Sequence, residues 1–465
     1  MRVFCTAVAA FALLASPALG QPAPQKPEVK AEARAIFERI IAFPTVQGRG
    51  AVPAMSEYLA EQLKSAGFRP EEIEIRTLGE TAALIVRYPG KKGSKKKPVL
   101  FLAHMDVVDA SEADWGRDPW KLTEHEGMFY GRGVVDNKYG VLTITQAFMR
   151  LRREGFTPDR DLILVFTGDE ETTGKTAQLV APGLTGAAYA LNSDAGGGFR
   201  PGGGVRPSYA TQVAEKTYAT FEITARNSGG HSSAPRLDNA IYDLAAALQK
   251  LSAYRFPPKF NKVTLASLAA TAPTLDGKVG DAMKRFVANQ NDAEALAVLE
   301  AENWIGNEMR TTCVATLLKA GHAENALPVA ATATVNCRIF PGETVAQVKD
   351  TLAKVMADAG LEIVVTGEPI ESDVSETPDE VTAALKKVLA VRAPGVVPVP
   401  YMEAGATDGL YFRAVGVPTI GVGPLFFVPD VDFNYHGNNE RLPIAAFDEG
   451  LDHYYLLIKA LAGKR

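Results

Sequence analysis

No apolar run in this 465-residue sequence is long enough to cross a lipid bilayer. The sequence also lacks an excess of positive charge, and its net charge of −5 gives no reason to expect nucleic acid or an anionic membrane as a partner. Five lysines gather at 91–97, but they stand in a Gly/Ser loop without aromatic residues, which indicates a solvated hairpin tip. The glycine-rich stretch 196–204 has no Gly-Lys-Ser/Thr ending, so it does not predict a nucleotide site.

The first twenty residues have the pattern of a signal peptide. Arg2 supplies the positive start, Val3–Leu14 is almost wholly apolar, and the small residues Ala18 and Gly20 precede a plausible cut before Gln21. We therefore expect a cleaved signal peptide over 1–20 and a periplasmic or secreted protein without membrane insertion.

Cysteine is scarce, with three residues, and Cys5 would leave with the signal peptide. Cys313 and Cys337 remain, in two strand-like segments that would form a hairpin centred near Asn325. Such a hairpin would set the two cysteines opposite each other. Both a cross-strand disulfide, which an oxidising compartment permits, and two buried free thiols stay open.

The order of segments predicts one domain inserted into another. Apolar strand-like runs at 82–88, 99–103 and 161–166 alternate with helix-like runs, which is typical of α/β layers with a largely parallel or mixed sheet. From about Ala210 longer alternating strands suit an α+β insert, and the α/β character returns near Ser372. We expect an α/β catalytic domain over 21–210 and 374–465, interrupted by an inserted domain over 211–373.

Candidate metal ligands follow the apolar strands. His104 and Asp106 end one strand and, being two residues apart, project the same way, so Asp106 could fix the His104 ring. Asp136 follows a glycine turn where a helix should begin. The remaining candidates are Glu170 and Glu171 after the next strand, Asp194, and His436. Taken singly, each has an ordinary reading: a structural histidine, a helix cap or a solvated acidic loop.

Taken in order, these motifs resemble the co-catalytic zinc peptidase and aminoacylase family, which includes carboxypeptidase G, carboxypeptidase S, carnosinases and succinyl-diaminopimelate desuccinylase. The resemblance covers essentially the whole mature chain and implies a zinc-exopeptidase-like domain with an inserted lid and dimerisation domain. It implies two Zn²⁺ ions, with Co²⁺ or Mn²⁺ as possible substitutes. One zinc would be held by His104, Asp136 and Asp194, and the other by Asp136, Glu171 and His436. Asp106 would support His104, and Glu170 would be the general base.

The lid of this family supplies further residues. The segment Ser228–Pro235 resembles the family's lid motif, which implies that His231 stabilises the oxyanion, often across a dimer interface. Asn325 and Arg338 match positions that hold the substrate carboxylate, which arginine can grip with two parallel hydrogen bonds. The stretch from about Phe256 to Asn307 is an apparent insertion, and an enlarged lid can replace the second subunit, so a homodimer is an open expectation.

The expected function is hydrolysis of an amide bond next to a free carboxylate in a small peptide, of the carboxypeptidase or dipeptidase type. N-acyl amino acid deacylation is the alternative, since it shares the chemistry and differs in the pocket. A non-catalytic zinc- or peptide-binding protein is the remote alternative, because it would be expected to lack the base or a ligand.

Overall fold

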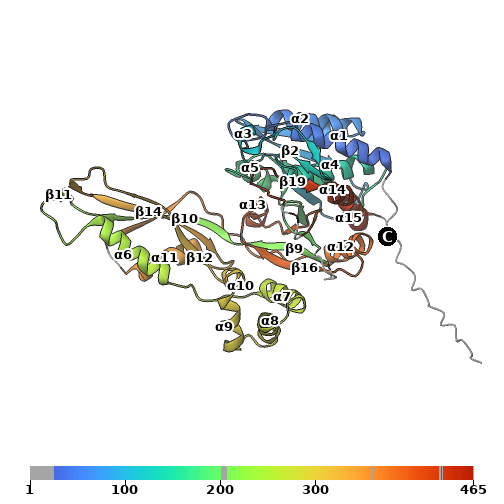
Figure 1. Ribbon diagram of the computed structural model, residues 1–465. Helices are drawn as coiled ribbons and strands as arrows, with labels where there is room; N and C mark the ends of the chain where they lie inside the picture. The colour runs from blue at the N-terminus through green and yellow to red at the C-terminus, as the bar shows by residue number, and fades with distance from the viewer. Residues whose placement is uncertain (1–25, 201–206, 358–359, 429–430, 432, 464–465) are drawn as a thin grey trace, which may run out of the picture.

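The computed structural model describes residues 26–200, 207–357, 360–428, 431 and 433–463. It shows a rounded α/β domain and an elongated lid that projects from one side of it (Figure 1). The segment expected to be a signal peptide lies outside the described residues. Within the described residues, no helix has the length and apolar character needed to span a membrane.

A mixed sheet forms the centre of the α/β domain, as the sequence predicted, and it contains ten strands. Nine strands follow the order β1-β2-β6-β3-β7-β17-β9-β8-β18, and β16 pairs with β9. Their bounds are β1 Ile73–Leu78, β2 Thr81–Tyr88, β3 Val99–His104, β6 Leu162–Thr167, β7 Tyr189–Asn192, β8 Gly197–Phe199, β9 Ser208–Glu215, β16 Pro398–Glu403, β17 Thr419–Gly421 and β18 Phe426–Phe427. Strands β3, β6 and β7 run parallel, so their carboxyl ends meet at one edge of the sheet.

Helices cover both faces of this sheet, because its central strands are apolar on both sides. Phe101 and Leu164 point into the larger core, whereas Leu100 and Ile163 point into the smaller one. The helices of the larger core are α1 Pro27–Ile41, α2 Val52–Ser65, α4 Lys138–Arg153, α12 Asp379–Arg392, α14 Ile444–Gly450 and α15 His453–Ala462; those of the smaller core are α5 Lys175–Val180, η2 Ala181–Leu184 and α13 Gly409–Ala414. Short elements complete the domain: η1 Pro70–Glu72, α3 Glu112–Trp115, and a small sheet of β4 Thr123–His125, β5 Met128–Tyr130 and β19 Arg441–Pro443.

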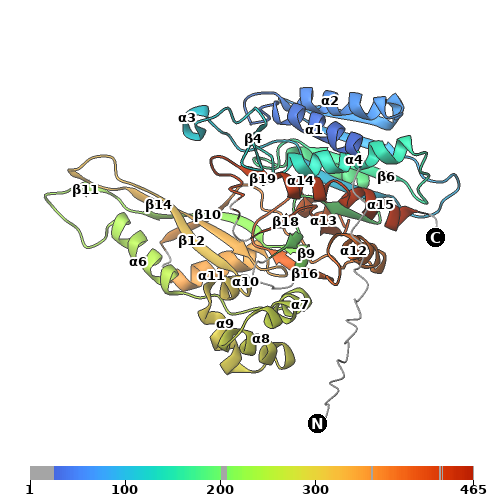
Figure 2. The ribbon, with the colours of Figure 1, turned by 45° about the vertical axis from the view of Figure 1, so that its right-hand side comes forward.

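The lid contains a four-stranded antiparallel sheet in the order β12-β14-β10-β15. Two helices cover one face of this sheet, and the side chains of the other face are largely exposed. The bounds are β10 Thr217–Arg226, β12 Thr312–Ala320, β14 Ala330–Ile339, β15 Leu361–Thr366, α6 Ala240–Ala253 and α11 Val345–Met356. The short pair β11 Gly230–His231 and β13 Ala326–Leu327 forms the end of the lid farthest from the α/β domain (Figures 1 and 2).

The first domain boundary lies later than expected. The sequence placed it between residues 210 and 211, but this position falls inside β9, which pairs with β16 in the main sheet. The chain enters the lid at Lys216, directly between β9 and β10. The shift has a simple cause: β9 and β10 are both long strands, and only their pairing partners assign them to different sheets.

A helical insertion interrupts the lid between α6 and β12. It consists of α7 Lys262–Thr271, η3 Ala272–Thr274, α8 Lys278–Ala288, α9 Ala293–Ala301 and α10 Asn303–Glu308. These helices have a small core of their own, which includes Leu268, Phe286 and Leu299. Helix α7 also packs on β16, so the insertion lies at the base of the lid and not at its far end (Figure 2).

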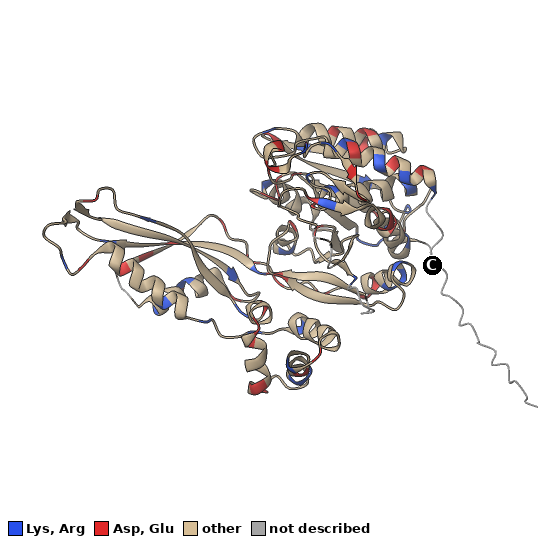
Figure 3. Cartoon of the chain, in the orientation of Figure 1, with Lys and Arg blue, Asp and Glu red and all other residues tan. Residues whose placement is uncertain are grey.

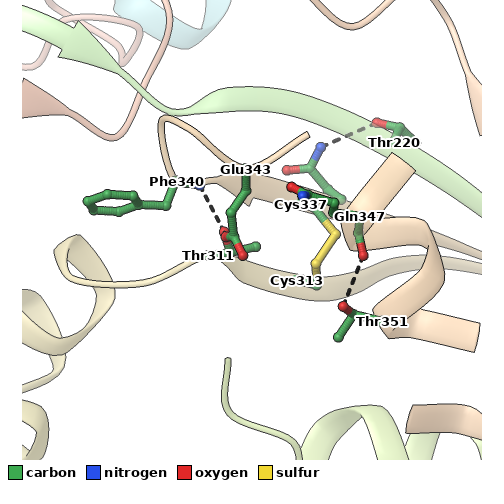
Figure 4. Close-up of a disulfide and its surroundings, with 9 residues drawn as sticks. Thr220, Thr311, Cys313, Cys337, Phe340, Glu343, Gln347 and Thr351 are labelled. Atoms are coloured by element: carbon green, nitrogen blue, oxygen red, sulfur yellow. Dashed lines mark hydrogen bonds between the residues drawn. A yellow bond between two sulfur atoms is a disulfide. The ribbon is translucent and has the colours of Figure 1, made fainter. Parts of the chain in front are cut away.

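Cys313 and Cys337 form a disulfide between β12 and β14, which confirms the first of the two alternatives (Figure 4). The two residues are direct partners in the antiparallel register, as a hairpin centred at Asn325 requires. The disulfide therefore ties the outermost strand of the lid sheet to its neighbour.

Candidate active site

Five of the predicted metal ligands come together at the carboxyl edge of the main sheet. His104 ends β3, Glu171 follows β6 and Asp194 follows β7. Asp136 precedes α4, and His436 comes from the part of the chain that follows the lid. The sheet brings these segments together because β3, β6 and β7 are parallel neighbours.

The distances within the cluster suit a shared metal site. Nε2 of His104 lies 3.0 Å from Oδ1 of Asp136 and 3.3 Å from Oδ1 of Asp194. On the other side of Asp136, Nε2 of His436 lies 3.1 Å from its Oδ2 and 3.0 Å from Oε1 of Glu171. Asp136 thus stands between the two histidines, which is the position that a bridging ligand needs.

The donor set fits metal ions. Ligand atoms of His104, Asp136 and Glu171 all lie within 4.8 Å of one another, as do those of His104, Glu170 and Asp194. Four carboxylates at this spacing repel one another unless cations neutralise them. Mixed histidine and carboxylate ligands are typical of catalytic zinc sites, which keep a position open for water.

The carboxylates of the cluster differ in the direction of their pKa shifts. Burial would raise the pKa of Asp136, but hydrogen bonds with His104 and His436 hold it well below its usual range. Burial raises the pKa of Asp194 to about 6, even though His104 opposes this shift. Burial and the neighbouring carboxylates Asp194, Asp408 and Glu171 raise the pKa of Glu170 well above its usual value. A carboxyl group with a raised pKa is suited to accept and return a proton near neutral pH.

Asp106 has a wider structural role than its spacing suggested. Nδ1 of His104 lies 3.0 Å from the backbone oxygen of Asp106 and 3.5 Å from its carboxylate. That carboxylate accepts the backbone amides of Glu170 at 3.1 Å and Glu171 at 3.0 Å. Asp106 therefore orients the histidine ligand and also holds the loop that carries Glu170 and Glu171.

Glu440 is a buried residue that the sequence motifs do not single out. Its carboxylate accepts the backbone amides of Gly133 at 2.8 Å, Val135 at 2.7 Å and Asp136 at 3.1 Å. It also accepts Nη1 of Arg132 at 3.0 Å, while Nη2 of Arg132 donates to the backbone oxygen of Gly437 at 2.9 Å. The pair thus fastens the loop of Asp136 to the loop of His436. The sequence gives one indication of this role, which is that Glu440 stands four residues after the predicted ligand His436.

The backbone at His436 is also unusual. Its φ of +61° lies in the left-handed region, which side chains other than glycine rarely adopt. Such conformations cost on the order of 1–3 kcal/mol and persist where the surroundings impose them. The Arg132 hydrogen bond to Gly437 is one such constraint.

A cavity of about 480 Å³ opens above the cluster. Its lining includes Glu170 and the aromatic residues Tyr401, Phe427 and Tyr435. The loop 405–409 contributes Thr407 to this lining. Next to it, burial raises the pKa of Asp408 to about 8, and Thr167 donates a hydrogen bond to its carboxylate.

The three predicted lid residues occupy two different places. His231 and Asn325 are exposed neighbours at the far end of the lid, where the amide of Ser232 donates to the backbone oxygen of Asn325 at 3.0 Å. Arg338 instead lies at the base of the lid, where its Nη1 donates to the backbone oxygen of Ala404 at 3.2 Å. The far end of the lid stands away from the α/β domain that holds the metal-ligand cluster (Figure 1).

The other histidines lie outside the cluster. His125 is exposed in the β4–β5 hairpin and His322 is exposed in the lid. His453 is buried on α15, where burial and the neighbouring Arg392 hold its pKa well below the usual value.

An α/β domain with a clustered histidine and carboxylate site, interrupted by a lid, defines a class of hydrolases that includes peptidases and amidohydrolases. The chain belongs to peptidase family M20/M25/M40, whose sequence profile matches residues 100–460.

The chain is 29% identical over 374 residues to human N-fatty-acyl-amino acid synthase/hydrolase PM20D1, covering 78% of this chain and 74% of that relative. It is 24% identical over 452 residues to Aminoacylase-1A of Rattus norvegicus, covering 94% of this chain and 97% of the relative. Its fold matches the M20 family metallo-carboxypeptidase Sso-CP2 from Sulfolobus solfataricus with a TM-score of 0.69 at 18% identity. That match covers 92% of this chain and 99% of the other. These similarities agree with the zinc-exopeptidase-like fold expected from the sequence.

Proposed function

We propose that this protein is an exported, two-zinc hydrolase that cleaves an amide bond next to a free carboxylate, of the carboxypeptidase or dipeptidase type. The observation that supports it most directly is Asp136 standing between His104 and His436, each of which approaches a different oxygen of its carboxylate. The expected export depends on the pattern of residues 1–20.

The chain's own residues account for binding and proton transfer. One zinc would be held by His104, Asp136 and Asp194, and the other by Asp136, Glu171 and His436, with Co²⁺ or Mn²⁺ as possible substitutes. When bound, such ions supply an acidified water and polarise the scissile carbonyl. Glu170 lies in the same cavity and takes the proton from the attacking water. It then delivers that proton to the nitrogen of the leaving amine, while Asp106 holds its loop in place.

We further propose that His231 and Asn325 act in the site of a second copy of the chain. They lie together at the end of the lid that stands away from their own metal cluster. The outer strand β12 and helix α6 expose large apolar side chains that a partner would cover: Ile241, Tyr242, Leu317 and Leu318. The lid ribbon carries few charged residues along its strands, which suits a protein interface (Figure 3).

N-acyl amino acid hydrolysis is the second candidate. The human relative's name assigns it N-fatty-acyl-amino acids. The cavity beside the metal-ligand cluster has an apolar wall, which would suit an acyl group. This wall consists of Tyr401, Leu425, Phe427 and Tyr435.

The deciding experiment measures amine release by the zinc-loaded mature protein from dipeptides, longer peptides and N-acyl amino acids. The matched controls are the same compounds with the carboxylate capped as an amide, and the Glu170→Gln enzyme. Chelator-sensitive release that needs the free carboxylate would support the proposal, and the preferred compound would separate peptidase from deacylase. An absence of release from the whole panel, with zinc bound, would contradict it.

A further inference from the structure

A second, larger hollow lies at the base of the lid. It has a volume of about 1340 Å³ and runs between the end of α6, helix α10 and the start of β12. Its lining includes four apolar or aromatic residues: Trp304, Leu248, Tyr254 and Val314. We call this hollow the insertion groove, because Trp304 comes from the helical insertion.

The insertion groove adjoins the cavity above the metal cluster. Ala404 and Arg338 line the groove, while Glu403 and Gly405, on either side of Ala404, line the cavity. The two hollows therefore meet at the backbone segment 403–405. A substrate that extends beyond the cavity towards the lid would reach the groove at Arg338.

Arg338 is placed to bind an anion at this boundary. Its guanidinium lies 4.6 Å from the ring centroid of Tyr218 and donates to the backbone oxygen of Ala404. Among the residues that the structure describes, no carboxylate forms an ion pair with it. A half-buried guanidinium that pairs with carbonyl and aromatic groups only can accept the carboxylate of a ligand.

The wall opposite is fixed in place. Lys216, at the entrance to the lid, donates through Nζ to the backbone oxygen of Arg310 at 2.6 Å and to that of Asn307. Helix α7 packs on β16, and the insertion has its own apolar core. Nevertheless Trp304 leaves half of its surface exposed, at 50%, on the groove side of this unit. An aromatic side chain of this size, exposed in a hollow on a rigid unit, is suited to contact a ligand.

We propose that the insertion groove holds the side chain of the residue whose carboxylate Arg338 binds, and that it selects a bulky aromatic or apolar residue on that side of the scissile amide. This inference rests on the proposed function, because the carboxylate that Arg338 would bind is the one next to the cleaved amide bond. It adds a specificity-determining role for Trp304 and for the helical insertion.

The kinetic test keeps the acyl group constant and changes only the amino acid. Wild-type enzyme should prefer N-acetyl-phenylalanine to N-acetyl-alanine in kcat/KM by about 10- to 100-fold, the range expected for filling an apolar pocket. Trp304→Ala should reduce this ratio about tenfold, and Trp304→Phe should retain most of it. Phe260→Ala removes an aromatic ring from the same insertion outside the groove lining, and should keep the wild-type ratio. An unchanged ratio in Trp304→Ala would overturn the proposal.

A binding test does not depend on turnover. In zinc-loaded Glu170→Gln protein, N-acetyl-phenylalanine should change the fluorescence of Trp304 in a saturable way, with Trp304→Phe used to subtract the signal of the other two tryptophans. N-acetyl-phenylalaninamide, which lacks the carboxylate, should give no such change. Hydrolysis without any dependence on Trp304 would refute the groove assignment alone. Saturable binding to Glu170→Gln, together with no hydrolysis by the zinc-loaded wild-type enzyme, would support the groove and refute the reaction class.

Discussion

The carboxylate of Glu440 accepts a hydrogen bond from the backbone amide of Asp136 at 3.1 Å, so a fully buried acid holds the residue at the centre of the cluster. The same carboxylate pairs with Arg132, whose other nitrogen binds the loop of His436. Two ligands on distant segments are therefore positioned by one ion pair.

Replacing Glu440 should weaken metal binding before it affects chemistry. Glu440→Gln puts an amide where three backbone amides need an acceptor, so we expect a 10- to 100-fold loss of zinc affinity, as for other residues that orient metal ligands. Zinc content after dialysis against graded free zinc, and the visible spectrum of the cobalt form, would measure this loss. Glu449→Gln, which breaks an ion pair with Arg200 elsewhere in the domain, is the matched control. Equal zinc affinity in Glu440→Gln and wild type would refute the role.

Replacing the proposed base should separate metal binding from turnover. Glu170→Gln retains the shape of the side chain but cannot take a proton, so kcat should fall by about 10²- to 10⁴-fold while two metals stay bound. Metal analysis and amine release on the same preparation would test this prediction. An active Glu170→Gln enzyme would assign the base to another residue.

The distance between the end of the lid and its own metal cluster predicts complementation between two inactive variants. Glu170→Gln lacks the proposed base and His231→Ala lacks the proposed oxyanion donor, but a mixed dimer would contain one complete site. After equal amounts are unfolded and refolded together, activity should recover to about a quarter of wild type, since half of the dimers are mixed and each has one working site. His231→Ala should keep its zinc. Mixtures no more active than the separate variants would show that the lid does not act in trans.

His453 should make stability depend on pH below neutrality. Its Nδ1 accepts from Nη1 of Arg392 at 2.7 Å and its Nε2 donates to the backbone oxygen of Val422 at 3.0 Å, so the folded state holds the neutral ring. Burial and Arg392 lower the pKa of His453 in the folded state, so the unfolded chain takes up the extra proton first as pH falls below about 6.5. The free energy of unfolding should then decrease by up to about 1.4 kcal/mol per pH unit from this residue.

Thermal unfolding of wild type and His453→Gln between pH 7 and pH 5 would measure this contribution. The variant should lose less stability over the interval, because glutamine does not titrate there. His125→Gln, which changes an exposed histidine of the β4–β5 hairpin, should behave like wild type. If the stability of all three proteins depended on pH in the same way, His453 would not be the group that causes the loss of stability.

The disulfide should stabilise the lid sheet. Cys313 and Cys337 are separated by 24 residues, and closing a loop of this length is worth about 3 kcal/mol in chain entropy. The double variant Cys313→Ser, Cys337→Ser should therefore unfold at lower denaturant concentration. Thiol titration of the denatured, unreduced mature protein should find neither cysteine free, and two reactive thiols would contradict the cross-link.

The sequence predicted the parts of the site that local patterns encode. His104 and Glu171 follow apolar strands, and the parallel order of those strands then places them at one edge. Apolar periodicity with flanking Pro or Gly predicts helices over about 29–43, 52–66 and 137–154. Helices α1, α2 and α4 begin and end within two residues of these positions.

Contacts between segments that are far apart in the chain were harder to predict from the sequence. Strands β17 and β18 contain three and two residues, which is too few for a periodic signal. The Glu440 contacts join segments about three hundred residues apart, and no local pattern reports such a partner. The position of His231 at the far end of the lid follows from the length of the β10–β14 pairing, which only the folded register reveals.

The proposed metal ligands are divided between two parts of the chain, so the two metal positions would be completed at different points during synthesis. His104, Asp136, Glu171 and Asp194 all precede the lid, whereas His436 follows it by way of the whole inserted domain. A chain that has emerged only as far as the lid has an incomplete ligand set, and the second metal position closes only when the last segment folds back against the first. Only the proposed second metal position therefore requires a completed chain, whereas the proposed first position, formed by His104, Asp136 and Asp194, needs only the part that precedes the lid.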